Sequence, residues 1–382
     1  MGARTNSISE VLYEEVAAVD TTEIIKLKAT AQEEWKPIIE EWKPIIVWRN
    51  VILFTALHIG AFIGLYQLIF QASFMTIIWT IICQVLSELS VTAGAHRLWA
   101  HRSYKARTPL KIFLMLTNCM ALQNDIIEWA RDHRCHHKWT DTDADPHNIE
   151  RGFFFAHMGW LMTKKHPKLK EMGGKLDLTD LTSDPVLAFQ RRHYLPLIGF
   201  FCFLFPALVA VYGWNESFFV AWYTACIFRY CSSLHVTWLI NSAAHTFGYR
   251  PYDQNISPAE NPWTSFTAIG EGGHNFHHTF PYDYRTSEMP LFLNFTRGFI
   301  DVCAKLGLAY DMKVVSKESA IEDRIENEEE ELYELWTVLQ INILDYLSAN
   351  DQLETAEMES DEPEPSQTAM KPITYNFMDY CF

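Results

Sequence analysis

Four long apolar stretches occur along this 382-residue chain, and each is long enough to cross a lipid bilayer as a helix. Only Gln71-Ala72 separates the first two, and residues 214–217 separate the last two. Buried helices of a soluble protein are the alternative, but two pairs joined by very short links favour membrane hairpins. The pattern predicts an all-α integral membrane protein with four transmembrane helices, covering about 48–70, 73–95, 195–213 and 218–240.

Basic residues between the two hairpins indicate how the chain is oriented. The short links contain no Lys or Arg, whereas residues 96–194 contain sixteen. Loops rich in Lys and Arg stay on the cytosolic side of a membrane. We therefore expect a cytosolic helical cap built from residues 96–194 and 241–312. Because the number of spans is even, both termini should be cytosolic.

The formal net charge of −16 belongs almost entirely to the C-terminal end, where residues 316–382 carry 18 acidic and three basic side chains. A chain with this balance is not expected to bind nucleic acid. We divide it into a cytosolic N-terminal segment (1–46), a main domain (47–312) and an acidic tail (313–382). The tail should be part helix and part disordered; a solvated tail and a docking segment for a basic partner are both compatible with its composition.

Histidine carries the candidate chemistry. Three clusters lie in the expected cap, and His245 follows the fourth span. Imidazoles at i, i+3 and i+4 share one helix face, whereas the i, i+5 pair of the first cluster would lie about 140° apart on an α-helix and would bracket a helix end or serve different metals. Nine imidazoles are too many for one ion, so two ions are expected. The candidate ligands are His96, His101, His133, His136, His137, His245, His274, His277 and His278.

The type of ligand does not by itself identify the metal, because imidazole binds zinc, copper, iron and nickel. A zinc pair would suit a hydrolase, but the chain has no His-Glu-x-x-His motif. Two irons can activate dioxygen, and the apolar surroundings suggest an inert substrate such as an alkyl chain.

Several motifs in chain order resemble the membrane-bound acyl-CoA desaturases of the stearoyl-CoA desaturase family, most of all the insect members. The likeness runs from about residue 47 to residue 312. It is carried by residues 92–106, by residues 128–134 with His136-His137, and by residues 143–148, 241–245 and 270–275.

The resemblance implies a mushroom-shaped protein of the endoplasmic reticulum membrane. The nine histidines would bind two iron ions, and Asn241 would reach one of them through water. The family introduces a cis double bond into a saturated fatty acyl-CoA, using dioxygen and electrons from cytochrome b5 and NADH-cytochrome b5 reductase. Position delta-9 is usual, and insect relatives with other positions, such as delta-11, serve pheromone biosynthesis. His166-Pro167 is followed by Lys168, so a fused haem-binding His-Pro-Gly-Gly motif is absent at this point and a separate donor is expected.

The resemblance also implies a narrow tunnel for the acyl chain. Gln123, Trp129 and Thr237 would hold a bend in that chain at the metals, and Trp238 would be a further substrate contact. The resemblance also places a binding site for the coenzyme A headgroup at five further positions. The cationic side chains among them can pair with the phosphate groups of coenzyme A. These positions are Asn50, Arg131, Asp132, Lys164 and Lys165.

Two positions depart from the family pattern. Gly273 stands where Phe is usual, which would loosen the third cluster unless a neighbour fills the gap. Glu88 lies in the second span near the expected tunnel end, where it could alter substrate choice, pack as a neutral group or pair with Arg229. Two rival functions therefore stay open: a related di-iron hydroxylase or acetylenase, and an inactive lipid-binding paralogue. His58 and His235 are interpreted as ordinary core residues.

Overall fold

A computed structural model describes residues 43–358, so the expectations for residues 1–42 and 359–382 lie outside the described part. The chain divides into a large unit, residues 21–329, and a second unit that includes residues 330–382. All site residues predicted above belong to the large unit. The C-terminal helix α18, Lys317–Met358, begins in the large unit and continues into the second.

Three helical segments of the described residues are long and apolar enough to cross a membrane. Helix α3 has the bounds that the apolar pattern predicts, and the second segment extends beyond the predicted span by a π-helical continuation, η1. The third consists of α11, the π-helix η4 and α12. Their bounds are α3 Trp48–Phe70, α4 Phe74–Leu89, η1 Ser90–Ala100, α11 Tyr194–Ile198, η4 Gly199–Leu204 and α12 Phe205–Trp214.

The fourth predicted span, 218–240, is helical but is not apolar enough to count among these segments. It is formed by α13 (Phe218–Ala221), the π-helix η5 (Trp222–Phe228) and α14 (Arg229–Thr246). Polar side chains explain the difference, above all the fully buried Arg229. Its guanidinium donates hydrogen bonds to the carbonyl oxygens of Met120 and Cys202 and to Ser87 Oγ. The suggested pairing of Arg229 with Glu88 is therefore wrong, because neighbouring carbonyls and a hydroxyl satisfy this cation.

Small residues set the contact between α3 and η5. Gly60 and Gly64 are spaced as Gly-x-x-x-Gly, a pattern that lets membrane helices approach closely. A Cβ on Gly64 would lie 2.1 Å from the Tyr223 carbonyl oxygen, and a Cβ on Gly60 would lie 2.9 Å from Ile227. The close approach fixes α3 against the helix that continues into α14, and both helices line the cavity described below.

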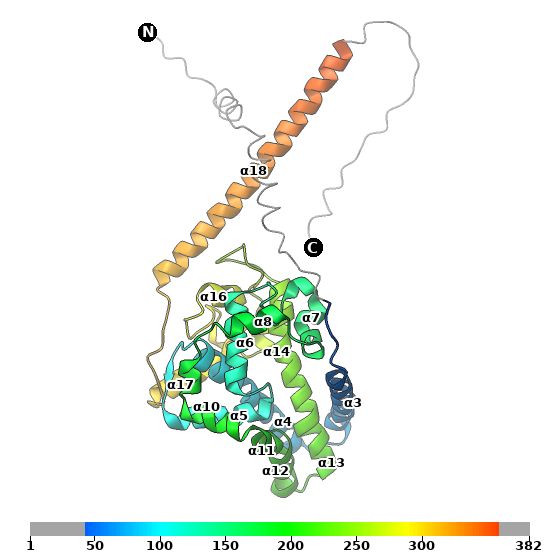
Figure 1. The fold of residues 1–382 in the computed structure, drawn as a ribbon, viewed down its shortest axis with the longest axis vertical. Coiled ribbons are helices and arrows are strands. Elements are labelled where there is room, and N and C mark those ends of the chain that lie inside the picture. Colours follow the sequence, from blue (N-terminus) through cyan, green and yellow to red (C-terminus); the bar gives the residue numbers. More distant parts are fainter. Residues whose placement is uncertain (1–42, 359–382) are drawn as a thin grey trace, which may run out of the picture. The chain divides into compact units, whose positions relative to one another are not determined.

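Shorter elements complete the large unit. Figure 1 shows α6, α7, α8 and α16 gathered at one end of the long helices, with α12 and α13 at the other. The main apolar core packs η1, α5, α6 and α17 together. The elements are β1 Lys105–Ala106, α5 Thr108–Ala121, α6 Ile126–Lys138, η2 Ile149–Arg151, α7 Phe153–His157, η3 Gly159–Met162, α8 Pro167–Gly173, α9 Thr179–Thr182, α10 Pro185–Arg192, α15 Pro262–Thr267, α16 His274–Thr279, η6 Leu291–Leu293, α17 Phe295–Lys305 and β2 Ala309–Tyr310, the strand antiparallel to β1.

Candidate functional site

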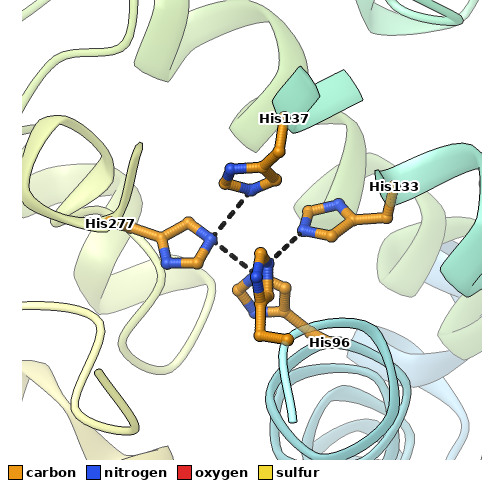
Figure 2. Close-up of side chains that lie close together, drawn as sticks. His96, His133, His137 and His277 are labelled. Atoms are coloured by element: carbon orange, nitrogen blue, oxygen red, sulfur yellow. Dashed lines mark hydrogen bonds between the residues drawn. The ribbon is translucent and has the colours of Figure 1, made fainter. Parts of the chain in front are cut away.

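The nine predicted histidines gather into two clusters. The first, which we call cluster one, consists of His96, His101, His133, His137 and His277, and the second, cluster two, consists of His136, His245, His274 and His278; in each, the potential ligand atoms lie within 4.8 Å of one another. Figure 2 shows His277 facing both His96 and His137, with Nε2–Nε2 distances of 2.9 and 3.0 Å. Helices α6 and α16 each supply side chains to both clusters, so the clusters are neighbours.

The π-helix η1 explains why His96 and His101 point into the same cluster. The His101 amide donates to the His96 carbonyl oxygen at 3.0 Å, an i→i+5 hydrogen bond. In a π-helix, residues five apart lie almost one above the other, whereas in an α-helix they do not. Both rings belong to cluster one, so the expectation that they serve different metals is wrong, because it assumed α-helical periodicity. The alternative, that the pair brackets a helix end, agrees with the structure, because His101 is the C-cap residue of η1.

The distances between the imidazoles fit metal coordination. Nε2 atoms are 2.8 Å apart in the pair His101–His133 and 3.0 Å apart in the pair His245–His274. Two nitrogens bound at about 2.1 Å and at right angles to each other are about 3.0 Å apart, while tetrahedral ligands are about 3.4 Å apart. The imidazoles of each cluster therefore lie close enough together to bind one ion.

The protonation states also fit. Burial, followed by repulsion from neighbouring imidazoles, holds the pKa of six of these rings well below the usual value, so they are neutral with free lone pairs at neutral pH. Metal ligands must be deprotonated in this way. In addition, the buried Nε2 atoms of His136 and His278 have no hydrogen-bond partner, which leaves them available to an ion. The six rings are His101, His133, His137, His274, His277 and His278.

A buried carboxylate orients His96. Glu271 Oε2 accepts from His96 Nδ1 at 2.9 Å, while Oε1 accepts from Arg97 Nε at 3.1 Å and from Nη2 at 2.8 Å. Burial opposes ionisation of Glu271, but Arg97 and His96 outweigh it and lower its pKa to about 2. Because Nδ1 donates to the carboxylate, Nε2 of His96 is left as the lone pair that faces cluster one.

Asp145 plays the same part for cluster two. Its carboxylate lies 2.9 Å from His136 Nδ1 and also accepts from the amide of His147. Although burial disfavours the charged form, the contact with His136 lowers the pKa of Asp145 to about 2. Neither Glu271 nor Asp145 was predicted to belong to the site, although both stand within the motifs that carry the resemblance. The available signal was a carboxylate a few residues from a ligand histidine.

An elongated cavity of about 840 Å³ reaches the histidines. Its wall is mainly apolar and comes from α3, η5 and α14, and His133 of cluster one forms part of it. Seven of the residues predicted to contact substrate, or to reach a metal through water, line this cavity. They are Asn50, Gln123, Trp129, Asp132, Thr237, Trp238 and Asn241.

The three residues predicted to hold a bend are joined by hydrogen bonds. Trp129 Nε1 donates to Gln123 Oε1 at 3.3 Å, and Gln123 Nε2 donates to Thr237 Oγ1 at 2.8 Å. The Trp129 ring also stacks on His133 at a centroid distance of 4.9 Å. This connection fixes one side of the cavity directly beside cluster one.

A group of charged side chains surrounds Asp132, which lines the cavity. Arg131 donates to Asp132 at 2.7 Å, and Lys165 pairs with both Asp132 and Glu128. Arg131 and Lys165 thus lie together, as the predicted headgroup site requires, but neither lines the cavity itself. Lys164 is exposed, and its backbone amide donates to the Ile45 carbonyl oxygen.

Glu88 lies beside the clusters and does not line the elongated cavity. It lines a smaller pocket of about 50 Å³ together with His96 and His274, one ligand candidate from each cluster. Gln84 donates to its carboxyl at 2.8 Å. Trp129, Thr237 and Asn241 line both spaces, so the small pocket is a neighbour of the elongated cavity.

Ser287 occupies the space next to Gly273, the position at which the resemblance predicts Phe. A Cβ on Gly273 would lie 2.1 Å from Ser287 Cβ and 2.9 Å from the Thr286 carbonyl oxygen. No larger side chain fits there without movement of the backbone. Ser287 and the backbone of Thr286 therefore fill this space, and the missing aromatic residue leaves no gap.

Comparison with known proteins agrees with this site. The profile of the family described as "Fatty acid desaturase" matches residues 72–311. A relative from Caenorhabditis elegans, Delta(9)-fatty-acid desaturase fat-6, is 62% identical over 301 residues, which is 79% of this chain and 87% of the relative. Human stearoyl-CoA desaturase is 56% identical over 271 residues, 71% of this chain and 75% of the relative.

An insect relative differs in its named activity. Acyl-CoA Delta12-desaturase from Acheta domesticus is 47% identical over 329 residues, 86% of this chain and 91% of the relative. The nematode relative shares more identity with this chain than the cricket relative does. The match over most of its length shows that this multi-pass membrane protein belongs to the fatty acid desaturase family, among the relatives of the stearoyl-CoA desaturases.

Proposed function

We propose that this chain is an acyl-CoA desaturase that introduces a cis double bond at position delta-9 of a saturated fatty acyl-CoA. The observation that carries the proposal is the arrangement of two buried histidine clusters beside a long apolar cavity. A cavity lined by both apolar side chains and a ligand candidate, His133, brings an alkyl chain to the metals. Three Caenorhabditis elegans relatives that are 57–62% identical to this chain bear delta-9 names.

The protein's own residues supply position. An alkyl chain has no functional group to recognise, so the shape of the cavity must select the carbons. The fixed connection from Trp129 through Gln123 to Thr237 would bend the chain so that two adjacent methylenes lie at the small pocket between the clusters. Arg131 and Lys165 would hold the coenzyme A phosphates at the other end.

Two iron ions bound by the nine histidines would supply the activation of dioxygen. In the overall reaction, one dioxygen becomes two waters, with two hydrogens from adjacent methylenes and two electrons and two protons from outside. We propose cytochrome b5 and NADH-cytochrome b5 reductase as the source of the electrons. We further propose the endoplasmic reticulum membrane, four spans, a cytosolic cap and cytosolic termini, supported by the sixteen basic residues of 96–194.

Expression in a yeast that lacks its own desaturase tests the activity. We expect growth without added unsaturated fatty acids, and delta-9 products when the double bonds are located by mass spectrometry. A chain with His96→Ala is the matched negative control. Hydroxylated or acetylenic products would favour the related di-iron oxidations. No product from a folded, iron-free protein would favour an inactive lipid-binding paralogue.

Glu88 offers a test of how the carbons are selected. We propose that its side chain closes one side of the small pocket and so limits how the acyl chain is seated. Glu88→Ala should then change the ratio of positional or chain-length products by about tenfold, the usual effect of space for a methylene or so. Glu88→Gln has the same size and should keep the original profile. An unchanged profile with alanine would exclude this role.

A further inference from the structure

A third group of potential metal ligands lies outside the two clusters. It consists of His58 on α3 and of Cys231 and His235 on α14, whose ligand atoms lie within 4.8 Å of one another. The Nε2 atoms of His58 and His235 are 2.9 Å apart, the same spacing that occurs within cluster one. Cys231 and His235 are one helical turn apart, so they share one face of α14.

The hydrogen bond at one end of this group fixes the tautomer of His58. Its Nδ1 lies 2.6 Å from the carbonyl oxygen of Phe54. A carbonyl oxygen can only accept a hydrogen bond, so Nδ1 carries the proton. In the neutral ring, Nε2 of His58 is therefore a lone pair, and it faces His235.

At the other end of the group, Ser242 and His157 determine which nitrogen of His235 carries the proton. Ser242 Oγ donates to the Trp238 carbonyl oxygen at 2.9 Å, so toward His157 Nδ1, also at 2.9 Å, it offers only a lone pair. His157 Nδ1 must then donate, which leaves His157 Nε2 to accept from His235 Nδ1 at 3.0 Å. With its proton on Nδ1, His235 also has a lone pair on Nε2.

Both ends of the chain of hydrogen bonds thus leave two lone pairs facing each other at 2.9 Å. Such a contact is repulsive unless a cation lies between the nitrogens. An extra proton would place an uncompensated charge in a partly buried, apolar position, which is costly. A metal ion satisfies both nitrogens, and the Cys231 thiolate on the same side would offset its charge.

We propose that His58, Cys231 and His235 form a separate site for a thiophilic metal ion, Cu⁺ or Zn²⁺. Imidazole and thiolate are the ligands that these two ions share. With Cu⁺ and one thiolate the site is neutral, which suits its apolar surroundings. The hydrogen bonds from His58 to Phe54 and from His235 to His157 are the outer contacts that orient histidines toward a metal.

The proposed metal site joins α3 and α14, two helices that form walls of the elongated cavity. Residues of α3 and α14, including Leu57 and Leu234 next to the proposed ligands, line the elongated cavity. A metal bound between His58 and His235 would hold these two walls at a fixed separation. The inference rests on this geometry and shares no residue with the nine-histidine site, so it stands or fails independently of the proposed function.

Metal analysis of the full-length protein tests the site. The protein is purified in detergent with an affinity tag that contains no histidine, incubated with one equivalent of Zn²⁺ or, under reducing conditions, of Cu⁺, and desalted. We expect about one Zn or Cu per chain in addition to iron. His58→Asn, Cys231→Ala and His235→Asn should each reduce this metal at least tenfold while the iron content stays unchanged.

Two controls make the result decisive. His193→Asn changes an exposed histidine and Cys303→Ala changes a buried cysteine of α17, so neither should affect the additional metal. Binding of Co²⁺ tests directly whether the Cys231 thiolate is a ligand, because the wild type should show a cobalt–thiolate absorption band that Cys231→Ala lacks. The unchanged iron content shows that the variants fold. Absence of the additional metal from the wild type, or its retention in all three variants, would overturn the proposal and leave a shared proton between His58 and His235.

Discussion

Replacement of His277 by alanine should abolish desaturation and lower the iron content from about two ions per chain to about one. The Nε2 atom of His277 lies within 3.0 Å of two other rings of cluster one, those of His96 and His137. Its loss therefore opens the centre of the cluster. The loss of activity should exceed the ~10–100-fold that removal of an outer partner of a metal site typically costs.

The measurement is product formation by purified protein with a reductant supply, together with iron analysis and size-exclusion chromatography. His193→Ala is the matched control, because it removes an exposed imidazole from outside both clusters. A protein with His277→Ala that elutes as the wild type but has lost iron supports the assignment. Retention of two irons and of activity would show that His277 is no ligand.

The sequence predicts the positions of the long helices and of the ligand candidates well. The apolar run from Trp48 to Phe70 has the bounds of α3, because length and composition determine a membrane span almost locally. All nine predicted histidines are brought together. Three separate histidine motifs in one chain have few roles other than metal binding, so their grouping could be predicted. These features depend on short stretches of sequence.

Features that depend on tertiary structure could not be predicted in the same way. The division of the histidines between two clusters depends on the π-helix η1, and no periodicity argument based on 3.6 residues per turn anticipates it. The interpretation of His58 and His235 as ordinary core residues missed their contact, because they are 177 positions apart. The partner of Arg229 was missed for a similar reason: carbonyl oxygens, which every residue carries, satisfy it.

Glu271→Gln should weaken iron binding and reduce activity by about 10–100-fold. Glutamine has the size of glutamate but offers one acceptor oxygen and one donor nitrogen. In the wild type, both carboxylate oxygens accept, one from His96 Nδ1 and one from Arg97. Whichever way the amide is turned, a donor therefore meets a donor: either His96 loses the contact that orients it, or the buried Arg97 loses its counter-charge.

Glu260→Gln is the matched control for this change. Glu260 is also buried, and its Oε1 accepts from the Phe276 amide at 2.9 Å, a contact that the oxygen of glutamine can keep. Iron content should be measured after exposure to a chelator, and activity with and without added Fe²⁺. Because Glu271 orients His96 and does not itself belong to cluster one, saturating Fe²⁺ should restore part of the activity of Glu271→Gln. If Glu271→Gln retained iron and activity as well as Glu260→Gln does, the carboxylate would not be needed to hold His96 toward the metal, and the charge on Glu271 would serve only to neutralise Arg97.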